Sequence, residues 1–470
     1  MRSPVHHKGS ECNVVNAKEV NGKGFQPALG LLPVLSIAIA AISPTTSVFL
    51  VYGAGLGSAG TGVFWAFIIG ACIAISMAFC YAELGSVHPR AGGAYSIVRK
   101  VLGGPLGFVA GLLFLVLGVV STASILVSAA TYLNSLVPQI PVNWAAVFMM
   151  LIITVFSLER IGTASWVAAV MLAIEMVVIT AFIIVTFAAV HHPLSFLLSP
   201  TTLDPKGHVM GVGLAGMMAA VVPALFAFNG YDWPLYFAEE TFEPRRTLPR
   251  AVMFAVVASV VFEVLAVISA TLAIPDLSKA LGSAAPLVYI AQSVVGPVGT
   301  TILLIGVVIA MFDTGLSANL GYARIYLDTA REGSWPEPIN RFFASMNRHR
   351  VPKWGFVFLG VGNAILCYFT SLNNLITFTG VIIVVIYLLI AVSAIVSRVR
   401  NRSTERPFRM PIWPIPPFVA IVGVILALTQ QASRDLITTT VIIVIALLYW
   451  LAYLRGKLET GSKGLSGNDI

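Results

Sequence analysis

Charged side chains are scarce in this chain of 470 residues, of which 10% are Asp, Glu, Lys or Arg and 58% are hydrophobic. The mean hydropathy is correspondingly high, at +0.91. A typical soluble domain carries about 25% charged residues, because its surface must face water. The scarcity of charge therefore excludes a soluble globular protein and indicates a polytopic membrane protein surrounded by a lipid bilayer.

Cysteine is also rare, and the cysteines show no paired spacing. They are Cys12, Cys72, Cys80 and Cys367. The chain also lacks a metal-spaced set of His, Cys and Asp residues, a nucleophile elbow and a phosphate-binding loop. These absences argue against a disulfide framework, a metal site, a cofactor and an enzymatic activity.

Apolar runs of about 17 to 25 residues recur along the chain, and each is long enough for one helical crossing of a bilayer. They lie at 31–52, 63–82, 106–133, 142–158, 164–190, 211–238, 251–274, 296–322, 354–371, 375–397, 412–429 and 436–454. We therefore predict an all-α fold with twelve transmembrane helices. No polar stretch between the runs is long enough for a soluble domain, so the functional residues must lie within the helical bundle.

Lys and Arg are distributed unevenly between the loops. Alternate loops carry clusters of them, as at 90–100 and 245–250, whereas the opposite loops contain only Lys206, Lys279 and Arg434. Positively charged loops stay in the cytoplasm, so both termini are predicted to be cytoplasmic and the protein to lie in the cytoplasmic (inner) membrane. This topology explains the net charge of +8, and no nucleic-acid partner is expected.

Two of the apolar runs are interrupted by residues that disfavour a continuous helix. The first run contains SPTTS at 43–47, and the sixth contains NGYDWP at 229–234. Breaks at corresponding positions five spans apart indicate an inverted-repeat transporter whose substrate binds between them. The simpler alternative is that Pro and Gly are tolerated in membrane helices, where neighbouring groups bond the freed backbone.

Three blocks of the sequence resemble a known family, the amino acid-polyamine-organocation (APC) permeases. YAELGSVHPRAGGAYSIVRKVLG at 81–103 resembles the signature after their second span, and FAFNGYDWPLYFAEETFEPRRTLPRAV at 226–252 resembles their broken sixth span. ARIYLDTAREGSWPEPINRFFASMNRHRVPKW at 323–354 is similar to the loop after their eighth span. The likeness runs from about residue 29 to 454 with the blocks in the family's order.

The resemblance implies the LeuT-like APC fold, in which two five-helix inverted repeats with broken helices 1 and 6 are followed by two further helices. Residues 29–400 would form this core and 401–455 helices 11 and 12, between cytoplasmic tails at 1–28 and 456–470. The implied activity is secondary transport of amino acids, amines or polyamines. SPTTS replaces the commoner Gly-Ser-Gly break and is closer to the putrescine permeases, which leaves open whether a substrate carboxylate binds there.

Four carboxylic acids lie inside the apolar runs, and no Lys or Arg lies there with them. They are Glu175, Asp232, Glu263 and Asp313. Ionisable groups within a membrane are costly and commonly functional. Without an internal counter-ion, each acid must bind a proton or a cationic ligand, so we expect protons and amine-bearing substrates to compete.

By resemblance, Glu175 falls where some APC permeases place a lysine that substitutes for sodium. It is predicted to carry the coupling proton, with a basic substrate anchor or an acid bonded by nearby hydroxyls as alternatives. Asp232 either meets a substrate amine or caps the second half of the broken span. Asp313 is expected to face the same cavity, and Glu263 to make an interhelical hydrogen bond.

The remaining predicted substrate contacts flank the two breaks. They are Ser43, Thr45 and Thr46 in the first span and Phe226, Phe228, Asn229 and Gly230 in the sixth. Phe226 is predicted to act as a gate, since it matches an aromatic position just before the break in the family. The sequence thus predicts proton-coupled uptake of an amino acid or amine by alternating access, with a proton-independent exchanger as the alternative.

Overall fold

The structure is a computed structural model that describes residues 28–90, 92–158, 161–204, 206–348, 351–400 and 402–456. Its first half contains α1 (Leu31–Ile42), α2 (Pro44–Ala59), α3 (Val63–Val87), α4 (Gly93–Leu102), α5 (Gly104–Leu136), α6 (Val142–Leu158), α7 (Ile161–Ala188), α8 (Ser195–Leu198) and α9 (Leu214–Ala227). Its second half contains α10 (Pro244–Leu272), α11 (Leu277–Gly282), α12 (Pro286–Arg331), α13 (Glu337–Ala344), α14 (Lys353–Phe369), α15 (Leu372–Arg400), α16 (Ile415–Leu428) and α17 (Ser433–Tyr449).

Seven helical stretches of the described chain are long and apolar enough to cross a membrane, and four shorter apolar helices accompany them. The prediction of a mainly helical, multi-pass membrane protein is therefore confirmed. The sequence did not predict the antiparallel hairpin of β1 (Thr201–Leu203) and β2 (Val209–Gly211). It also placed the start of the eighth run at 296, whereas α12 begins at Pro286 and kinks at Gly296.

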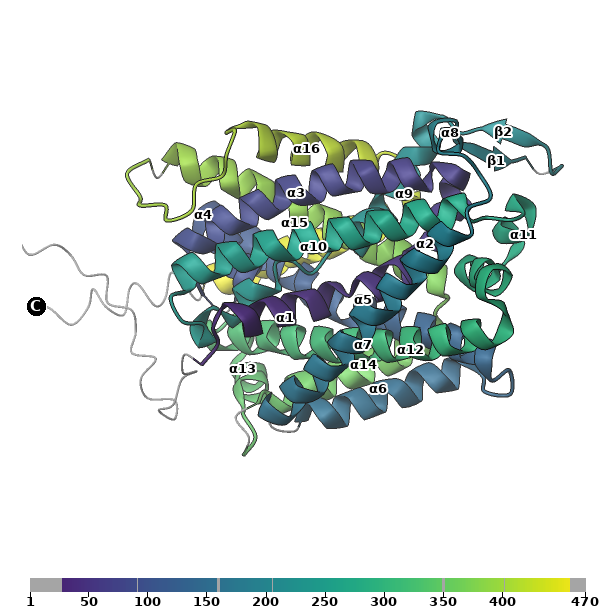
Figure 1. The fold of residues 1–470 in the computed structure, drawn as a ribbon. Coiled ribbons are helices and arrows are strands. Elements are labelled where there is room, and N and C mark those ends of the chain that lie inside the picture. Colours follow the sequence, from purple (N-terminus) through teal and green to yellow (C-terminus); the bar gives the residue numbers. More distant parts are fainter. Residues whose placement is uncertain are drawn as a thin grey trace, which may run out of the picture.

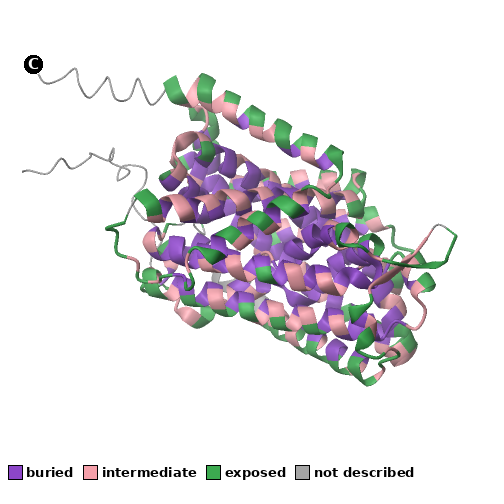
Figure 2. Cartoon of the chain, turned by 90° about the horizontal axis from the view of Figure 1, so that it is seen from above, coloured by how far each residue is buried: buried purple, intermediate pink, exposed green. Residues whose placement is uncertain are grey.

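The long helices pack side by side in one bundle (Figure 1). α3 packs against α9 and α10, and α12 packs against α5 and α7. The short helices α4 and α13 lie at one end of the bundle, whereas α11 and the β hairpin lie at the opposite end. Buried residues follow the middle of the bundle and exposed residues its outer faces (Figure 2). The helices thus bury their contacts with one another and expose apolar surface outward, as lipid requires.

The first break separates α1 from α2 at a single residue. Ser43 adopts a left-handed conformation, with φ 51° and ψ 84°. Pro44 follows as the first residue of α2. At this position the fixed φ of proline suits the helix, and the N–H that proline lacks would have no partner within the helix. The Ser43 hydroxyl accepts a hydrogen bond from the Thr46 amide at 3.2 Å. The serine therefore ends one helix and caps the next.

The second break follows α9 and lies directly against the first. Gly230 has φ 125°, and a Cβ atom there would lie 2.9 Å from the amide nitrogen of Ile42. The Ser47 hydroxyl lies 2.8 Å from the carbonyl oxygen of Ile42 and 2.7 Å from that of Ala227. One side chain of α2 thus contacts the last carbonyls of both α1 and α9. The chain resumes as a 3₁₀ helix at Trp233–Glu240.

Candidate functional site

A small cavity of about 30 Å³ lies where the two breaks meet. Its walls come from the ends of α1 and α9, from α2, α5 and α12, and from the segment after α9. They are Ala41, Ile42, Thr46, Ser47, Leu50, Ser121, Ile125, Phe226, Asn229, Trp233, Thr314, Ala318 and Tyr322. This volume accommodates a water molecule but no amino acid, so a solute needs the surrounding helices to separate.

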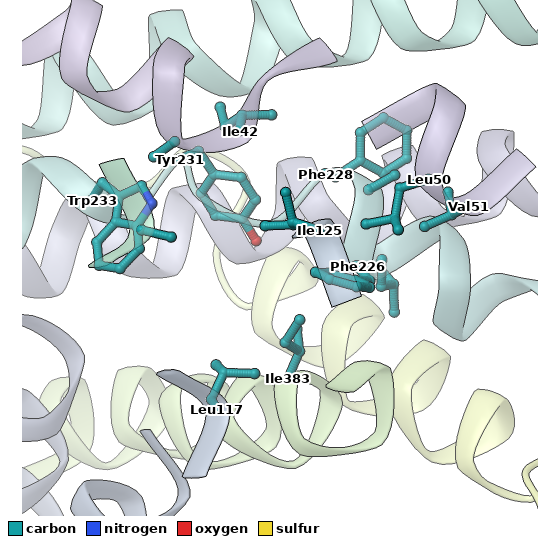
Figure 3. Packing of buried hydrophobic residues seen from close by; sticks show 14 of the residues in the cluster. Ile42, Leu50, Val51, Leu117, Ile125, Phe226, Phe228, Tyr231, Trp233 and Ile383 are labelled. Carbon is teal, nitrogen blue, oxygen red and sulfur yellow. The ribbon is translucent and has the colours of Figure 1, made fainter. Parts of the chain in front are cut away.

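The cavity wall is partly polar and partly apolar, and it is uncharged. Figure 3 shows apolar side chains of the wall, including Ile42, Leu50, Ile125, Phe226 and Trp233. The polar side-chain groups are hydroxyls, the Asn229 amide and the indole N–H of Trp233. Among the described residues that line the cavity, none is Asp, Glu, Lys or Arg. A buried charge needs an opposite charge or several hydrogen bonds, so this wall suits a net-neutral solute better than a polycation.

The structure places only part of the predicted substrate set on this wall. Thr46, Phe226 and Asn229 line the cavity. The predicted residues that do not line it are Ser43, Thr45, Phe228, Gly230, Asp232, Asp313 and Glu175. The wall also contains hydroxyls that sequence reasoning missed, at Ser47, Ser121, Thr314 and Tyr322. Serine and threonine are common in membrane helices, so the sequence offered no signal that set these four apart.

The aromatic residues before the second break occupy different environments. Phe226 lies on the cavity wall, where the sequence predicted a gate. Phe228 instead packs edge-on against Phe67 of α3, with ring centroids 5.6 Å apart. Phe228 therefore supports the helix packing behind the break.

Asp232 lies beyond the cavity among buried tyrosines. Its Oδ2 accepts a hydrogen bond from the Tyr236 hydroxyl at 3.0 Å. It precedes the 3₁₀ helix, but its side chain makes no capping hydrogen bond. The rings of Tyr81, Tyr231 and Tyr387 contact one another beside it. The structure thus places the carboxyl against a phenol, neither as a helix cap nor on the cavity wall.

Glu175 meets the first break from the side of α7. The Thr45 amide donates to its Oε1 at 3.3 Å, and the Thr45 hydroxyl donates to its backbone carbonyl at 3.1 Å. Its other carboxyl oxygen, Oε2, has no hydrogen-bond partner among the described residues. Glu175 is 0% exposed. The acid therefore lies behind the wall, in contact with Thr45 in the first turn of α2.

The other two membrane acids have few partners. Asp313 is buried in α12 next to Thr314, and neither of its carboxyl oxygens has a hydrogen-bond partner in the described chain. Glu263 accepts a hydrogen bond from the Ser259 hydroxyl at 2.6 Å. Because Ser259 belongs to the same helix, α10, the expected interhelical bond of Glu263 is replaced by an intrahelical one.

A larger cavity of about 250 Å³ opens toward the end of the bundle that carries α11. Its lining residues come from α2, α5 and α15, from the link between α11 and α12, and from the first residues of α12. Among them are Tyr132, Ser128 and Pro286. Leu50 of α2 lines both cavities. A solute entering from this end would therefore reach the central cavity past Leu50.

The opposite end of the bundle is closed by buried ion pairs. Arg324 of α12 donates to Glu240 at 2.9 Å, and its guanidinium lies 4.0 Å from the ring centroid of Phe237. This ion pair joins α12 to the 3₁₀ helix at Trp233–Glu240. Glu83 of α3 forms a second closure, because it accepts hydrogen bonds from two arginines that follow in α15 and the loop after it.

A family model described as amino acid permease matches residues 29–452. The chain is 24% identical to the branched-chain amino acid permease BcaP of Bacillus subtilis (strain 168), over 97% of this chain and 98% of that protein. It is 23% identical to BcaP of Lactococcus lactis subsp. cremoris (strain MG1363), over 81% and 84% of the two chains. It is also 23% identical to the human large neutral amino acids transporter small subunit 2, over 73% and 64%.

Proposed function

Because the chain belongs to the amino acid permease family, we propose that it is a secondary transporter of neutral amino acids with apolar side chains. The observation that carries this substrate class is the cavity wall, which combines hydroxyls and an amide with apolar side chains and no charged group. A polyamine would bring two or more positive charges to a wall that offers no carboxylate. The names of the similar permeases, which refer to branched-chain and large neutral amino acids, favour the same class.

We propose the following arrangement of the amino acid on this wall. Its carboxylate accepts hydrogen bonds from the hydroxyls of Thr46 and Thr314. These hydroxyls now bond each other, and that of Thr314 also bonds the Ala310 carbonyl, so both would rotate toward the solute as the helices separate. The amides that begin α2 are already engaged, since the Thr45 amide donates to Glu175, that of Thr46 to the Ser43 hydroxyl, and that of Ser47 to the Ser43 carbonyl.

The amino group in this arrangement bonds the side-chain oxygen of Asn229, and the apolar side chain packs on Ile125 and Phe226. Phe226 then closes over the substrate. These contacts lie on both breaks, so binding would draw the two half-helix junctions together.

The proposed fold is the twelve-helix APC arrangement, with a five-plus-five repeat over 29–400, two further helices over 401–455, and cytoplasmic tails at 1–28 and 456–470. Two observations support it. The breaks at Ser43 and Gly230 lie against each other, as the paired breaks of inverted repeats do. α4, which carries Arg99 and Lys100, lies at one end of the bundle, and this supports a cytoplasmic position for that end and an outer position for the end with α11.

We further propose that uptake is coupled to protons through Glu175, because this buried acid contacts the first break and has no cation beside it among its described partners. The test is uptake of leucine into proteoliposomes driven by a pH gradient without sodium. Glu175→Gln is expected to slow uptake driven by the pH gradient about 100-fold or more, the lower end of the usual contribution of a positioned proton-transfer group. Accumulation that requires sodium and ignores pH would contradict the coupling.

Substrate class is tested separately by ligand-induced thermal stabilisation of the purified protein. Leucine, isoleucine and valine should raise the unfolding temperature, because specific ligands stabilise the folded state in proportion to occupancy. Putrescine and lysine should leave it unchanged. Stabilisation by putrescine alone would overturn the neutral-solute proposal, and counterflow of leucine without any response to a pH gradient would favour the exchanger.

A further inference from the structure

Trp233 lies on the wall of the central cavity, at the start of a 3₁₀ helix that contacts α4. Figure 3 shows Ile125 and Phe226 between Trp233 and Leu50. Leu50 also borders the larger cavity, at the end of the bundle with α11. The indole of Trp233 therefore bounds the central cavity on the side opposite the larger cavity, toward the end with α4.

The indole packs directly on a glycine of α12. A Cβ atom at Gly321 would lie 2.3 Å from Cζ3 of Trp233, 2.6 Å from Cη2 and 2.7 Å from Cε3. Carbon atoms in contact are about 3.5 to 4.0 Å apart, so any larger residue at 321 would displace the ring. Gly321 lies three residues after Ala318 and seven after Thr314, on the face of α12 that lines the cavity.

Two tyrosine rings hold the indole in this position. The ring centroids of Trp233 and Tyr236 are 4.9 Å apart, and those of Trp233 and Tyr322 are 5.0 Å apart, both edge-on. Edge-on aromatic pairs stabilise a structure beyond the area that they bury. The Tyr236 hydroxyl is fixed in turn by its hydrogen bond to Asp232. The position of the indole on Gly321 is thus a packed one.

The ion pair of Arg324 and Glu240 lies beyond these rings. Arg324 follows Tyr322 by two residues in α12, and Glu240 ends the 3₁₀ helix that begins at Trp233. Neither charged residue lines the central cavity. A solute that leaves the cavity toward α4 therefore meets the indole first and the ion pair afterwards.

The backbone on both sides of Trp233 departs from helical geometry. Gly230 has φ 125°, and Phe237 has φ −106° and ψ 18° inside the 3₁₀ helix. A 3₁₀ segment has poorer hydrogen-bond geometry than an α-helix, and a short stretch of it often marks a hinge. Rotation at these two positions would move the indole without unwinding α9 or α10.

We propose that Trp233 is the inner gate residue of the central cavity, an inference that rests on the proposed alternating access. With its indole on Gly321, the path toward the cytoplasmic end is closed, as in this structure. The gate opens when the indole leaves Gly321, and a neutral amino acid in the cavity then passes toward the cytoplasm.

The test measures access to the cavity from each side of the membrane. Ser121→Cys places a thiol on the cavity wall, outside the proposed contacts with the solute. A membrane-impermeant thiol reagent is added to inside-out vesicles and, separately, to right-side-out vesicles. The parent without this substitution gives the background from its native cysteines. With Trp233 present, the thiol should react slowly from the cytoplasmic side.

Trp233→Ala is expected to raise the reaction rate from the cytoplasmic side about tenfold, as the loss of two aromatic pairs would. The rate from the outer side should not rise, whereas general loosening of the bundle would raise both. Gly321→Ala should also raise the cytoplasmic rate, because its Cβ displaces the indole. It should add nothing once Trp233 is replaced by alanine. Trp233→Phe keeps a ring next to Gly321 and should restore most of the closure.

Phe356→Ala is the matched control, because Phe356 is a buried ring of α14 that lines neither cavity. It should leave both rates unchanged. If Trp233→Ala and Gly321→Ala keep the parental rates while leucine still raises the unfolding temperature, the gate is wrong and the proposed function stands. If leucine fails to stabilise the protein while the rates change as expected, the substrate class is wrong and the gate stands.

Discussion

Single polar residues in this protein make several structural contacts each, because the apolar bundle contains few polar side chains. Ser43 ends α1, caps α2 and donates a hydrogen bond to the Thr46 hydroxyl. Ser47 binds the last carbonyls of two helices with one hydroxyl. At these positions the side-chain oxygen replaces backbone partners that a continuous helix would have supplied. A substitution at these positions therefore changes the hydrogen bonding of the backbone as well as the contacts with the solute.

His88, which follows α3, gives a pH-dependent prediction at the residue scale. Burial, with the positive charges of Lys100, Arg406 and Arg90, lowers the pKa of His88 to about 4. The folded protein therefore keeps this imidazole neutral at pH values where the unfolded chain, with an ordinary pKa of about 6.5, binds a proton. The free energy of unfolding therefore carries no penalty from His88 above pH 6.5, and it decreases as the pH falls from 6.5 toward 4.

The expected loss is up to about 3 kcal/mol, at about 1.4 kcal/mol for each unit of pKa shift. His88→Gln, which does not titrate, should flatten the curve of unfolding temperature against pH between 6.5 and 4. A parental curve that is flat over this range would contradict the prediction.

At the scale of elements, the site depends on a close approach between two broken segments. Gly230 comes so near to α1 that a Cβ atom would lie 2.9 Å from the Ile42 nitrogen and 3.0 Å from the Ala41 carbonyl carbon. Backbone atoms cannot move aside as a flexible side chain can. Glycine is thus required both by this contact and by its φ of 125°.

Gly230→Ala is expected to separate the two breaks. The left-handed backbone alone costs about 1 to 2 kcal/mol for alanine, and the collision with α1 adds to it. Leucine binding, measured by thermal stabilisation, should be lost together with part of the stability. Gly57→Ala in α2, where a Cβ atom meets nothing within 4 Å, should be neutral or stabilising. Full retention of leucine binding by Gly230→Ala would contradict this account.

At the scale of the whole molecule, the two ends of the bundle differ. The end with α11 holds the cavity of about 250 Å³, while the end with α4 and α13 is closed by ion pairs between helices distant in sequence. Glu83 illustrates the closure, because it binds Arg398, Arg406 and the amide of Met410. In alternating access, first one end of the bundle and then the other opens to solvent. These ion pairs would therefore have to break during transport.

Glu83→Gln is expected to loosen this closed end. Removing one partner of a buried ion pair leaves the other charge uncompensated, at a cost of about 3 kcal/mol or more. The unfolding temperature in detergent should fall, and a cysteine-reactive probe should reach the Cys80 thiol of α3 faster. Glu337→Gln is the control, since the Glu337–Arg341 pair is exposed and contributes less than about 1 kcal/mol. An equal effect of both substitutions would contradict the role of Glu83.

The sequence by itself determined that the chain is a multi-pass membrane protein and where several of its apolar helices lie. The run predicted at 142–158 coincides with α6, and SPTTS and NGYDWP contain Ser43 and Gly230, whose backbone φ is positive. These features are local, because a bilayer demands long apolar helices and because Pro and Gly act on the backbone at their own positions.

Only the tertiary structure decided which side chains reach the cavity. Neighbouring residues on a helix point about 100° apart, so Thr314 lines the cavity while Asp313 does not. α12 is apolar on most of its surface, and no amphipathic pattern in its sequence shows which side faces the site. The rotation of each helix is fixed by packing against distant segments, as where Gly230 meets Ile42. The membrane acids that the sequence predicted as functional consequently do not line the cavity, whereas hydroxyls such as that of Thr314 do.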